Sequence, residues 1–161
     1  MGIKYSDQDN LMPVLAVRQP WASLIEMGYK TLEVRNMNTH FRGPIAIYAS
    51  RSKPKKADLA LFEDHIVFSG GGDCLPYGMI IAKAELAGCK KHVSESTFDS
   101  LRHKHLAPMS YYQAGKTCLW MLENVQTVEP VDFKASSIVW SSIDRDMIKV
   151  AGTDCIPEVY A

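Results

Sequence analysis

The sequence has no excess of charge of either sign. Its 161 residues include 18 Lys and Arg against 18 Asp and Glu, so the formal net charge is zero. No global basic field attracts a polyanion, and any nucleic-acid site must be a local cluster of basic side chains. The hydrophobic fraction of 47% and the charged fraction of 22% are typical of a globular domain with a core of its own.

Other absences narrow the function classes further. The cysteines at positions 74, 89, 118 and 155 include no C-x-x-C pair, so the close ligand pairs of structural zinc sites are missing, and we expect no metal or cofactor. The glycine run at 69–73 lacks the following Lys-Ser/Thr of a Walker-type phosphate loop. No apolar run approaches the length of a membrane span, and no apolar stretch follows a basic start, so we expect a cytoplasmic or nuclear protein with no membrane partner.

Short strands dominate the predicted secondary structure. Alternating or continuous apolar runs predict strands at 11–16, 30–35, 43–50 and 77–88, and residues 116–133 predict a strong strand and a weaker one broken before Pro130. Helical patterns cover 19–28, 54–66 and 96–105. Strands outnumber helices by about two to one, which favours an α+β fold built on a small mixed β-barrel with two or three flanking helices. We expect a flexible N-terminus over residues 1–10 and a single domain over 11–161.

Mixed charges follow the predicted helix stop at Gly28. Glu33 and Arg35 are two residues apart, so on a strand their side chains leave the same face about 7 Å apart. One interpretation is a solvated strand face with an ion pair worth about 0–1 kcal/mol. The other adds Lys30 before the pair and Arg42 after it. Three cations around one carboxylate suit a site that clamps phosphate and reads a base edge.

A second basic cluster follows at the start of the predicted helix over 54–66. Its cations crowd a helix N-terminus, where the helix dipole disfavours positive charge, and they are Arg51, Lys53, Lys55 and Lys56. These side chains either form a basic helix end that is exposed to solvent, or they contact a phosphate backbone. Rings on which single-stranded bases could stack are Trp21, Tyr29, Tyr48, Tyr111, Tyr112 and Trp140. Trp120 is expected in the core, whereas Trp140, beside two serines, is a candidate ligand wall.

Two segments resemble the ASCH domain, the activating signal cointegrator homology domain, in its eukaryotic coactivator form and in bacterial and phage relatives. They are "LAVRQPWASLIEMGYKTLEVR" and "FRGPIAIYAS". The family's Q-P-W-A helix start is here residues 19–22, and its G-x-K-x-x-E-x-R motif supplies Gly28, Lys30, Glu33 and Arg35. Its downstream R-G pair is residues 42–43. The resemblance covers most of 12–143 and is strongest over 14–50. It implies a PUA-like β-barrel with a cleft beside the first helix, in a family regarded as RNA-related.

The resemblance leaves binding and catalysis open. Some bacterial members are amidohydrolases of acetylcytidine that use a lysine, a threonine three residues later and a distant glutamate. Lys30 matches the lysine, but Glu33 stands in place of the threonine, and Glu85 is only a guess for the glutamate. Single-strand ribonuclease activity is attributed to other members, and here Glu33 could be general base, with Tyr48 and Lys53 as general acid and phosphate anchor.

The sequence therefore predicts a protein that binds RNA, another single-stranded nucleic acid or a modified nucleotide. The expected binding residues are Gln19, Trp21, Lys30, Glu33, Arg35, Arg42, Arg51, Lys53, Lys55 and Trp140. The alternative is a hydrolase on the same ligand class, a metal-independent ribonuclease or an amidohydrolase, with catalytic residues Lys30, Glu33, Tyr48 and Lys53. A third hypothesis is a protein-interaction domain, favoured if Lys30 and Arg35 are tied up in structural ion pairs.

Overall fold

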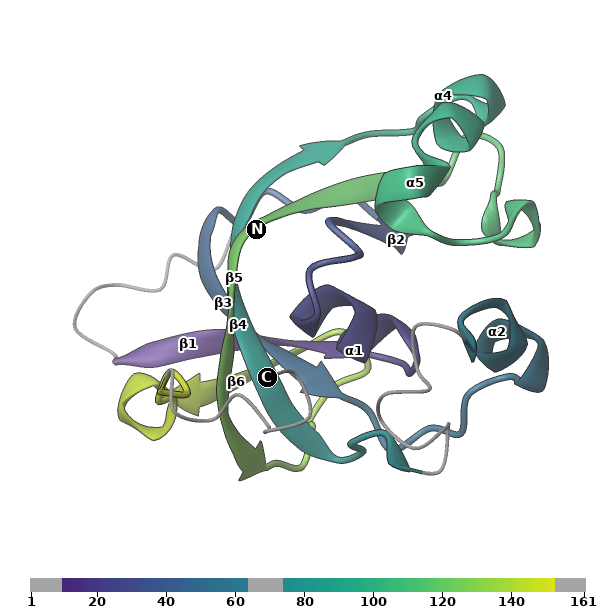
Figure 1. The fold of residues 1–161 in the computed structure, drawn as a ribbon. Helices are drawn as coiled ribbons and strands as arrows, with labels where there is room; N and C mark the ends of the chain where they lie inside the picture. The colour runs from purple at the N-terminus through teal and green to yellow at the C-terminus, as the bar shows by residue number, and fades with distance from the viewer. Residues whose placement is uncertain (1–9, 64–73, 153–161) are drawn as a thin grey trace.

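The fold is seen in a computed structural model, which describes residues 10–63 and 74–152 (Figure 1). The described residues form six strands and several short helices. In order they are β1 (Leu11–Val17), α1 (Trp21–Glu26), β2 (Leu32–Arg35), β3 (Gly43–Ala49), α2 (Lys56–Leu61), β4 (Met79–Lys90), α4 (Glu95–Ser100), α5 (Arg102–His105), the 3-10 turn η3 (Met109–Tyr111), β5 (Cys118–Asp132), β6 (Trp140–Asp144) and the 3-10 turn η4 (Arg145–Met147). The glycine run at 69–73 lies outside the described residues.

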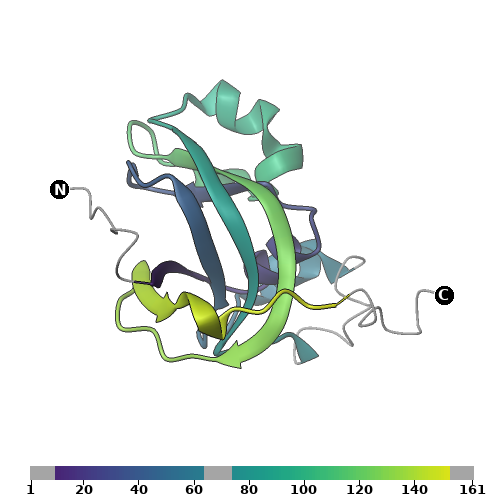
Figure 2. The same cartoon turned by 90° about the vertical axis from the view of Figure 1, so that its left-hand side faces the viewer.

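The strands form one mixed sheet in the order β2-β5-β4-β3-β1-β6. β1 and β3 are parallel, and the other neighbours are antiparallel. Figures 1 and 2 show β4 and β5 bending together, so the sheet curls around α1 on its concave side. The expected α+β class is confirmed, and the sheet has a barrel-like curvature. It stays open, because β2 and β6 lie at opposite ends of the strand order.

One long strand replaces the two that the sequence predicts over 116–133. β5 continues through Pro130 to Asp132. Pro130 is tolerated because it lies in a register irregularity of the β4–β5 ladder, where the pairs Ile80–Val131 and Ala82–Thr127 flank it. A proline has no N–H for the ladder, so within sheets it is confined to edges and such bulges.

The helices are shorter than predicted. The segment 96–105 divides at Leu101 into α4 and α5, and α4 begins after Ser94, whose Oγ accepts a hydrogen bond from the Thr97 N–H. That cap lies earlier than the sequence suggests. α2 begins at Lys56, and the end of the predicted segment 54–66 lies outside the described residues. No helix in the described ranges is both long and apolar enough to span a membrane.

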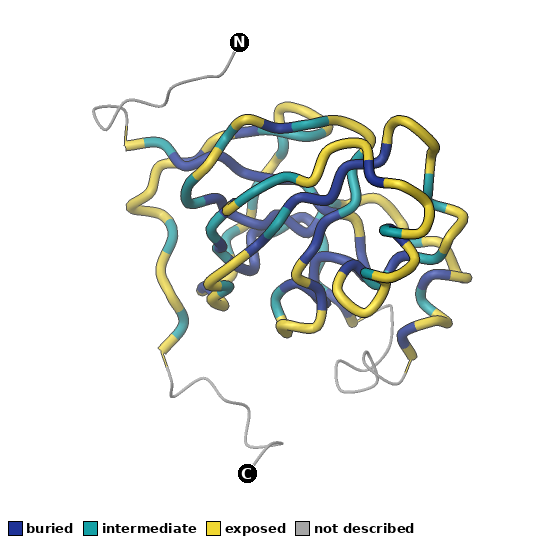
Figure 3. The backbone as a smooth tube through the Cα atoms, turned by 90° about the horizontal axis from the view of Figure 1, so that it is seen from above, coloured by how far each residue is buried: buried dark blue, intermediate teal, exposed yellow. Residues whose placement is uncertain are grey.

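α1 joins the core as its apolar spacing predicts. Trp21, Leu24 and Ile25 are buried, and Gly28 follows the helix with a φ of 86°, a left-handed conformation that favours glycine. Trp120 is fully buried in the same core. Figure 3 shows the buried backbone running through the centre of the molecule with exposed turns around it. α1 is therefore a rigid support for the residues that follow it, which include Lys30.

Candidate functional site

A cavity of about 460 Å³ opens beside α1. Its wall comes from β1, α1, β2 and β3 and from the segments that follow β3, α5 and β5. The lining residues are Ala16, Val17, Arg18, Trp21, Lys30, Glu33, Val34, Arg35, Tyr48, Ser50, Arg51, Ser52, Ala107, Tyr111, Ala135, Ser137 and Ile138. We call this cavity the cleft. Its volume falls within the range of small-ligand sites.

Lys30 lies buried beside the cleft, with an exposure of 1%. Its Nζ donates hydrogen bonds to the carbonyl oxygens of Leu32 at 2.8 Å and His105 at 2.6 Å. It also lies 3.6 Å from Glu33 Oε1 and 5.3 Å from the centre of the Trp21 ring. Two of the three N–H donors of the ammonium are therefore used by backbone carbonyls, while Glu33 lies just beyond hydrogen-bond distance.

Glu33 connects the two basic side chains of the motif. Its Oε1 accepts from the backbone N–H of Val34 at 3.0 Å and faces Lys30, while its Oε2 accepts from Arg35 Nη2 at 3.1 Å. The carboxylate is almost completely buried. Both oxygens are therefore already engaged within the protein.

Arg35 completes the group and is the most accessible of the three. Its Nη2 also donates to the Ala16 carbonyl at 2.5 Å, and its guanidinium lies 5.7 Å from the Trp120 ring centre. The Arg35 side chain is 17% exposed. Lys30 and Arg35 do form ion pairs with Glu33, the condition that favours a protein-interaction domain. Against that reading, all three side chains line an open cleft.

The environment of Lys30 changes its proton affinity. Burial lowers the pKa of Lys30 from 10.5 to about 8, because an ammonium loses its hydration there. The Glu33 carboxylate opposes the shift, and the Arg35 charge adds to it. Burial is the largest cause, and it could not be inferred from the spacing of these residues in the sequence. A fraction of Lys30 is therefore neutral near physiological pH.

The mouth of the cleft carries further cations and rings. Arg18 and Arg51 are exposed, and both line the cleft. The Arg51 guanidinium lies against Gly78, where an added Cβ would be only 2.8 Å from Arg51 Cζ. Tyr48 is also in the lining, but it is only 3% exposed and belongs to a second core cluster, where it packs edge-on against Phe133 at 5.3 Å between ring centres. Cations at the mouth and rings in the wall are the groups that phosphates and bases bind.

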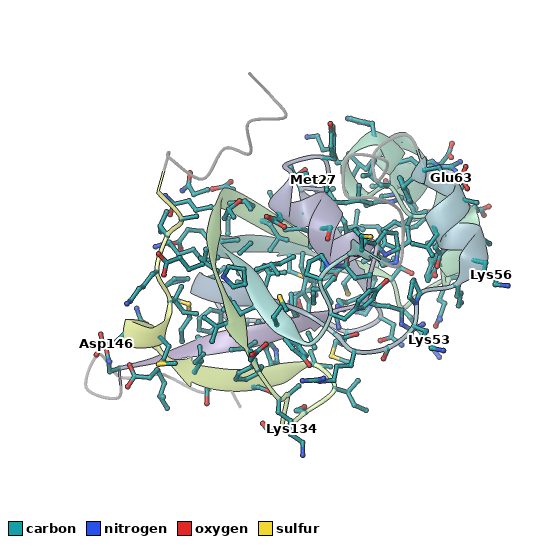
Figure 4. All side chains as sticks on the ribbon, turned by 60° about the horizontal axis from the view of Figure 1, so that its bottom comes forward. Met27, Lys53, Lys56, Glu63, Lys134 and Asp146 are labelled. Carbon is teal, nitrogen blue, oxygen red and sulfur yellow. The ribbon has the colours of Figure 1, made fainter. Side chains whose placement is uncertain are left out.

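Five predicted binding residues lie outside the cleft lining. Lys53 and Lys56 extend outward from the segment around α2 (Figure 4). Lys55 lies over the Tyr111 ring, with its Nζ at 5.1 Å from the ring centre. Arg42 Nη1 donates to the Thr39 and Phe41 carbonyls within its own loop. The three lysines therefore lie near α2 and outside the cleft lining, and Arg42 stabilises the loop to which it belongs.

The other two of the five have structural contacts. The Gln19 side chain is fully buried and caps α1, since Oε1 accepts from the Ser23 N–H and Nε2 donates to Ser23 Oγ and to the Pro76 carbonyl. Trp140 stacks on Trp120 at 5.6 Å between ring centres. Glu85, the guess for a third catalytic residue, lines a second cavity with Lys83 and Gln126 and is absent from the cleft lining.

The sequence does not single out Arg18, Asp58 or Ile138. The signal for Arg18 is its position directly after β1 and before the Q-P-W-A motif. Ile138 is 91% exposed and lines the cleft, where a ligand would cover it. Asp58 is 3% exposed and accepts a hydrogen bond from the Tyr111 hydroxyl. Only the folded chain brings Arg18 and Ile138 together in the cleft and places Asp58 against Tyr111, which belongs to the lining.

No metal centre accompanies the cleft in the part of the chain that the structure describes. Across residues 10–63 and 74–152, His, Cys, Asp and Glu side chains do not gather in groups of three or more that could hold an ion. His105 is engaged through both ring nitrogens: Nε2 donates to the Phe98 carbonyl at 2.6 Å, and Nδ1 accepts from the Ala107 N–H at 2.9 Å.

Comparison with protein families assigns the chain. The model of the ASCH domain matches residues 15–132, a segment that runs from the end of β1 to the end of β5 and includes the whole Lys30–Glu33–Arg35 group. The chain belongs to the ASCH domain family. This family is PUA-like and is linked to interaction with nucleic acids, so the resemblance noted from the sequence is confirmed. A comparison with curated proteins gives no match.

Solved ASCH structures share the fold. The ASCH protein of Zymomonas mobilis is 17% identical, with a TM-score of 0.54 over 77% of this chain and 75% of that one. A serine-to-alanine variant of the Zymomonas mobilis protein has a TM-score of 0.57 at 17% identity, over 82% and 87% of the two chains. A tyrosine-to-phenylalanine variant gives 0.50 at 18% identity, over 75% of each. These values support a common fold.

Proposed function

We propose that this ASCH domain binds single-stranded RNA or a modified nucleotide in the cleft. The observation that carries the proposal is the joint lining of one cavity of about 460 Å³ by aromatic rings and by guanidinium groups. Trp21 and Tyr111 supply the rings, and Arg18, Arg35 and Arg51 supply the cations. Bases stack on aromatic side chains for about 1–3 kcal/mol each, and arginine forks fit phosphate oxygens.

The positions of these groups suggest an orientation for the ligand. Arg18 and Arg51 are exposed at the mouth, so they can reach phosphates that remain in solvent. Trp21 is only 7% exposed and belongs to the inner wall, so a base would enter toward it. Lys53, Lys55 and Lys56 lie around α2 beyond the cleft, where they would contact the backbone of a longer strand.

A hydrolase acting on the same ligand is the second candidate. It is favoured by the pKa of about 8 for Lys30, which permits a neutral amine in the site, and by Tyr48 in the same lining. Three observations count against the specific schemes above. Both Glu33 oxygens are engaged, Lys53 is absent from the lining, and Glu33 replaces the threonine of the amidohydrolase set. Binding is therefore the better-supported function.

The test is a single-turnover incubation with labelled single-stranded RNA in the presence of a chelator, followed by a mobility-shift assay at low salt. The informative variant is Arg51→Ala, and Lys116→Ala is its control, because Lys116 is also exposed but does not line the cleft. We expect intact RNA that is shifted by the wild type and by Lys116→Ala and is shifted much less by Arg51→Ala. Equal shifts for the two variants, or no shift at all, would contradict binding in the cleft.

The same incubation decides the second candidate. RNA cleavage that is lost in Tyr48→Phe and retained in Lys116→Ala would make the domain a ribonuclease. Cleavage that survives Tyr48→Phe would remove Tyr48 as the acid.

A further inference from the structure

Tyr111, which lines the cleft, forms a polar pair with the buried Asp58. The Tyr111 hydroxyl donates a hydrogen bond to Asp58 Oδ2, and Asp58 is 3% exposed. The ring is held on two sides, by Lys55 Nζ at 5.1 Å from its centre and by the Trp21 ring, edge-on at 5.9 Å. Tyr111 itself is half-buried and lines the cleft. Its ring and its hydroxyl therefore have a fixed orientation.

The proton of this hydrogen bond belongs to Tyr111. An ionised carboxylate has no proton to give and can only accept. Burial, and then the Asp58 carboxylate, raise the pKa of Tyr111 to about 12, although the Arg18 charge opposes the shift. The phenol therefore stays protonated across the neutral range, with its single proton directed at Asp58. The remaining lone pairs of Oη can accept a hydrogen bond, but Oη has no second proton to donate.

At the deep end of the cleft the acceptor is the Glu33 carboxylate, and both of its oxygens already have partners within the protein. Glu33 Oε1 accepts from the Val34 N–H, and Oε2 accepts from Arg35. Lys30 donates to two backbone carbonyls and faces Glu33. A ligand amine directed at Glu33 would have to share an oxygen that already accepts from Val34 or from Arg35. The expectation that Glu33 reads an exocyclic amine thus fits the geometry less well than recognition at the wall.

We propose that Tyr111 selects the ligand of this cleft, and that the class it selects is a nucleobase carrying an exocyclic amino group. The amine N–H would donate to Tyr111 Oη, while Arg18 and Arg51 hold the phosphate. Asp58 is the positioning residue, since it fixes the direction of the Tyr111 proton. This inference rests on nucleotide binding in the cleft, as proposed above, and deepens it by naming the group that is read.

The test compares nucleotides that differ by the amino group alone. Cytidine 5′-monophosphate is paired with the analogue in which hydrogen replaces the 4-amino group, and adenosine 5′-monophosphate is paired with purine riboside 5′-monophosphate. Dissociation constants are measured by calorimetry or by NMR titration of the full chain. We expect the amino member of at least one pair to bind about tenfold more tightly, the value of one hydrogen bond.

Two variants and a matched control separate recognition from folding. Tyr111→Phe keeps the ring and removes the acceptor, so the amino preference should vanish. In Asp58→Asn the amide can donate to Oη and release the tyrosine proton, so the preference should weaken. Tyr112→Phe is the control, because the Tyr112 hydroxyl donates to the Val93 carbonyl and Tyr112 is absent from the cleft lining. It should leave the preference unchanged. Melting temperatures of all three report folding separately.

Each outcome is decisive. Equal affinity of both members of each pair for the wild type overturns the inference but leaves nucleotide binding in place. An amino preference that persists in Tyr111→Phe also overturns it, because another group then reads the amine. If neither nucleotides nor single-stranded RNA bind, the proposed function fails and this inference fails with it.

Discussion

The Lys30 ammonium is held more closely by the backbone than by its ionic partner. Its distances to the Leu32 and His105 carbonyl oxygens are 2.8 Å and 2.6 Å, whereas Glu33 Oε1 lies 3.6 Å away. Carbonyl groups carry no net charge, so they satisfy the N–H donors without fully compensating the burial of the charge. The geometry of Lys30 therefore depends on α5, which presents the His105 carbonyl.

The first prediction concerns Lys30 and alkaline pH. Its pKa is about 8 in the folded protein against an ordinary value of 10.5, so the unfolded chain holds this proton more tightly. Between these two values the unfolded state binds more protons, and the free energy of unfolding rises with pH. The gain should approach about 3 kcal/mol across that window. Urea unfolding of the wild type and of Lys30→Met at several pH values measures it.

The Lys30→Met variant isolates this contribution from other groups that titrate in the same range. Its overall stability will be lower, because it loses two hydrogen bonds and leaves Glu33 without one cation. Only the difference in pH slope between the two proteins is used. Parallel slopes would show that Lys30 titrates normally in the folded chain.

The second prediction concerns the carboxylate between the two cations. Glu33→Gln preserves the shape but leaves Lys30 and Arg35 without a negative charge, and removing one partner of a buried ion pair costs about 3–5 kcal/mol. Arg35 keeps partial exposure, so we expect about 3 kcal/mol. Since Glu33 is the group that raises the pKa of Lys30, that pKa should fall further. Chemical denaturation provides the measurement.

The exposed carboxylate of Glu123 in β5 offers a control for that substitution. Glu123→Gln should change the free energy of unfolding by about 0.5 kcal/mol or less, as is usual at the surface. A similar small change for Glu33→Gln would mean that the Lys30–Glu33–Arg35 group contributes nothing to stability.

The third prediction compares two glycines. Gly78 and Gly115 have φ values of 72° and 71°, so alanine suffers the same backbone strain at both. An added Cβ at Gly78 meets Arg51 Cζ at 2.8 Å, while at Gly115 nothing lies within 4 Å. We expect each variant to lose about 1 kcal/mol of stability, but only Gly78→Ala to displace Arg51 and weaken nucleotide binding. Equal nucleotide affinities would show that Arg51 adjusts freely.

The fourth prediction concerns His105 and acid. Burial lowers the pKa of His105 below 6.5, although the hydrogen bond to the Phe98 carbonyl opposes the shift. As the pH falls, the unfolded chain therefore takes up this proton before the folded protein does. The contribution of His105 to the free energy of unfolding is complete above pH 6.5 and decreases as the pH falls from 6.5 to the pKa of the folded protein. Melting temperatures of the wild type and of His105→Gln at descending pH test this. A fall of equal size in both proteins would exclude His105 as the cause.

Local patterns predict much of the fold and one part of the site. The alternation of Leu32 and Val34 with Glu33 and Arg35 places the two charges on one face, and the structure shows them paired. Gly28 marks the helix stop because its φ is positive. These features depend on neighbours a few residues apart, which a sequence pattern captures directly.

The rest of the site depends on contacts between distant segments. The burial of Lys30 requires α5, which lies some seventy-five residues later in the chain and supplies the His105 carbonyl. Gln19 belongs to a motif that suggests ligand binding, but its amide instead caps α1 and reaches Pro76. Lys53 lies outside the cleft lining because the segment before α2 leads away from the cleft. Spacing within one segment carries no information on such relationships.

The attachment of α2 has a consequence for any mutational scan of this protein. Side chains at both ends of α2 contact the two rings that form the cleft wall: Lys55 and Asp58 meet Tyr111, and Phe62 meets Trp21 edge-on at 5.2 Å. Replacing either ring with alanine would remove a stacking surface and also loosen the basic segment beside it. The effects of substitutions in the wall and in the lysines will therefore not be additive, and summing them would count part of the binding energy twice.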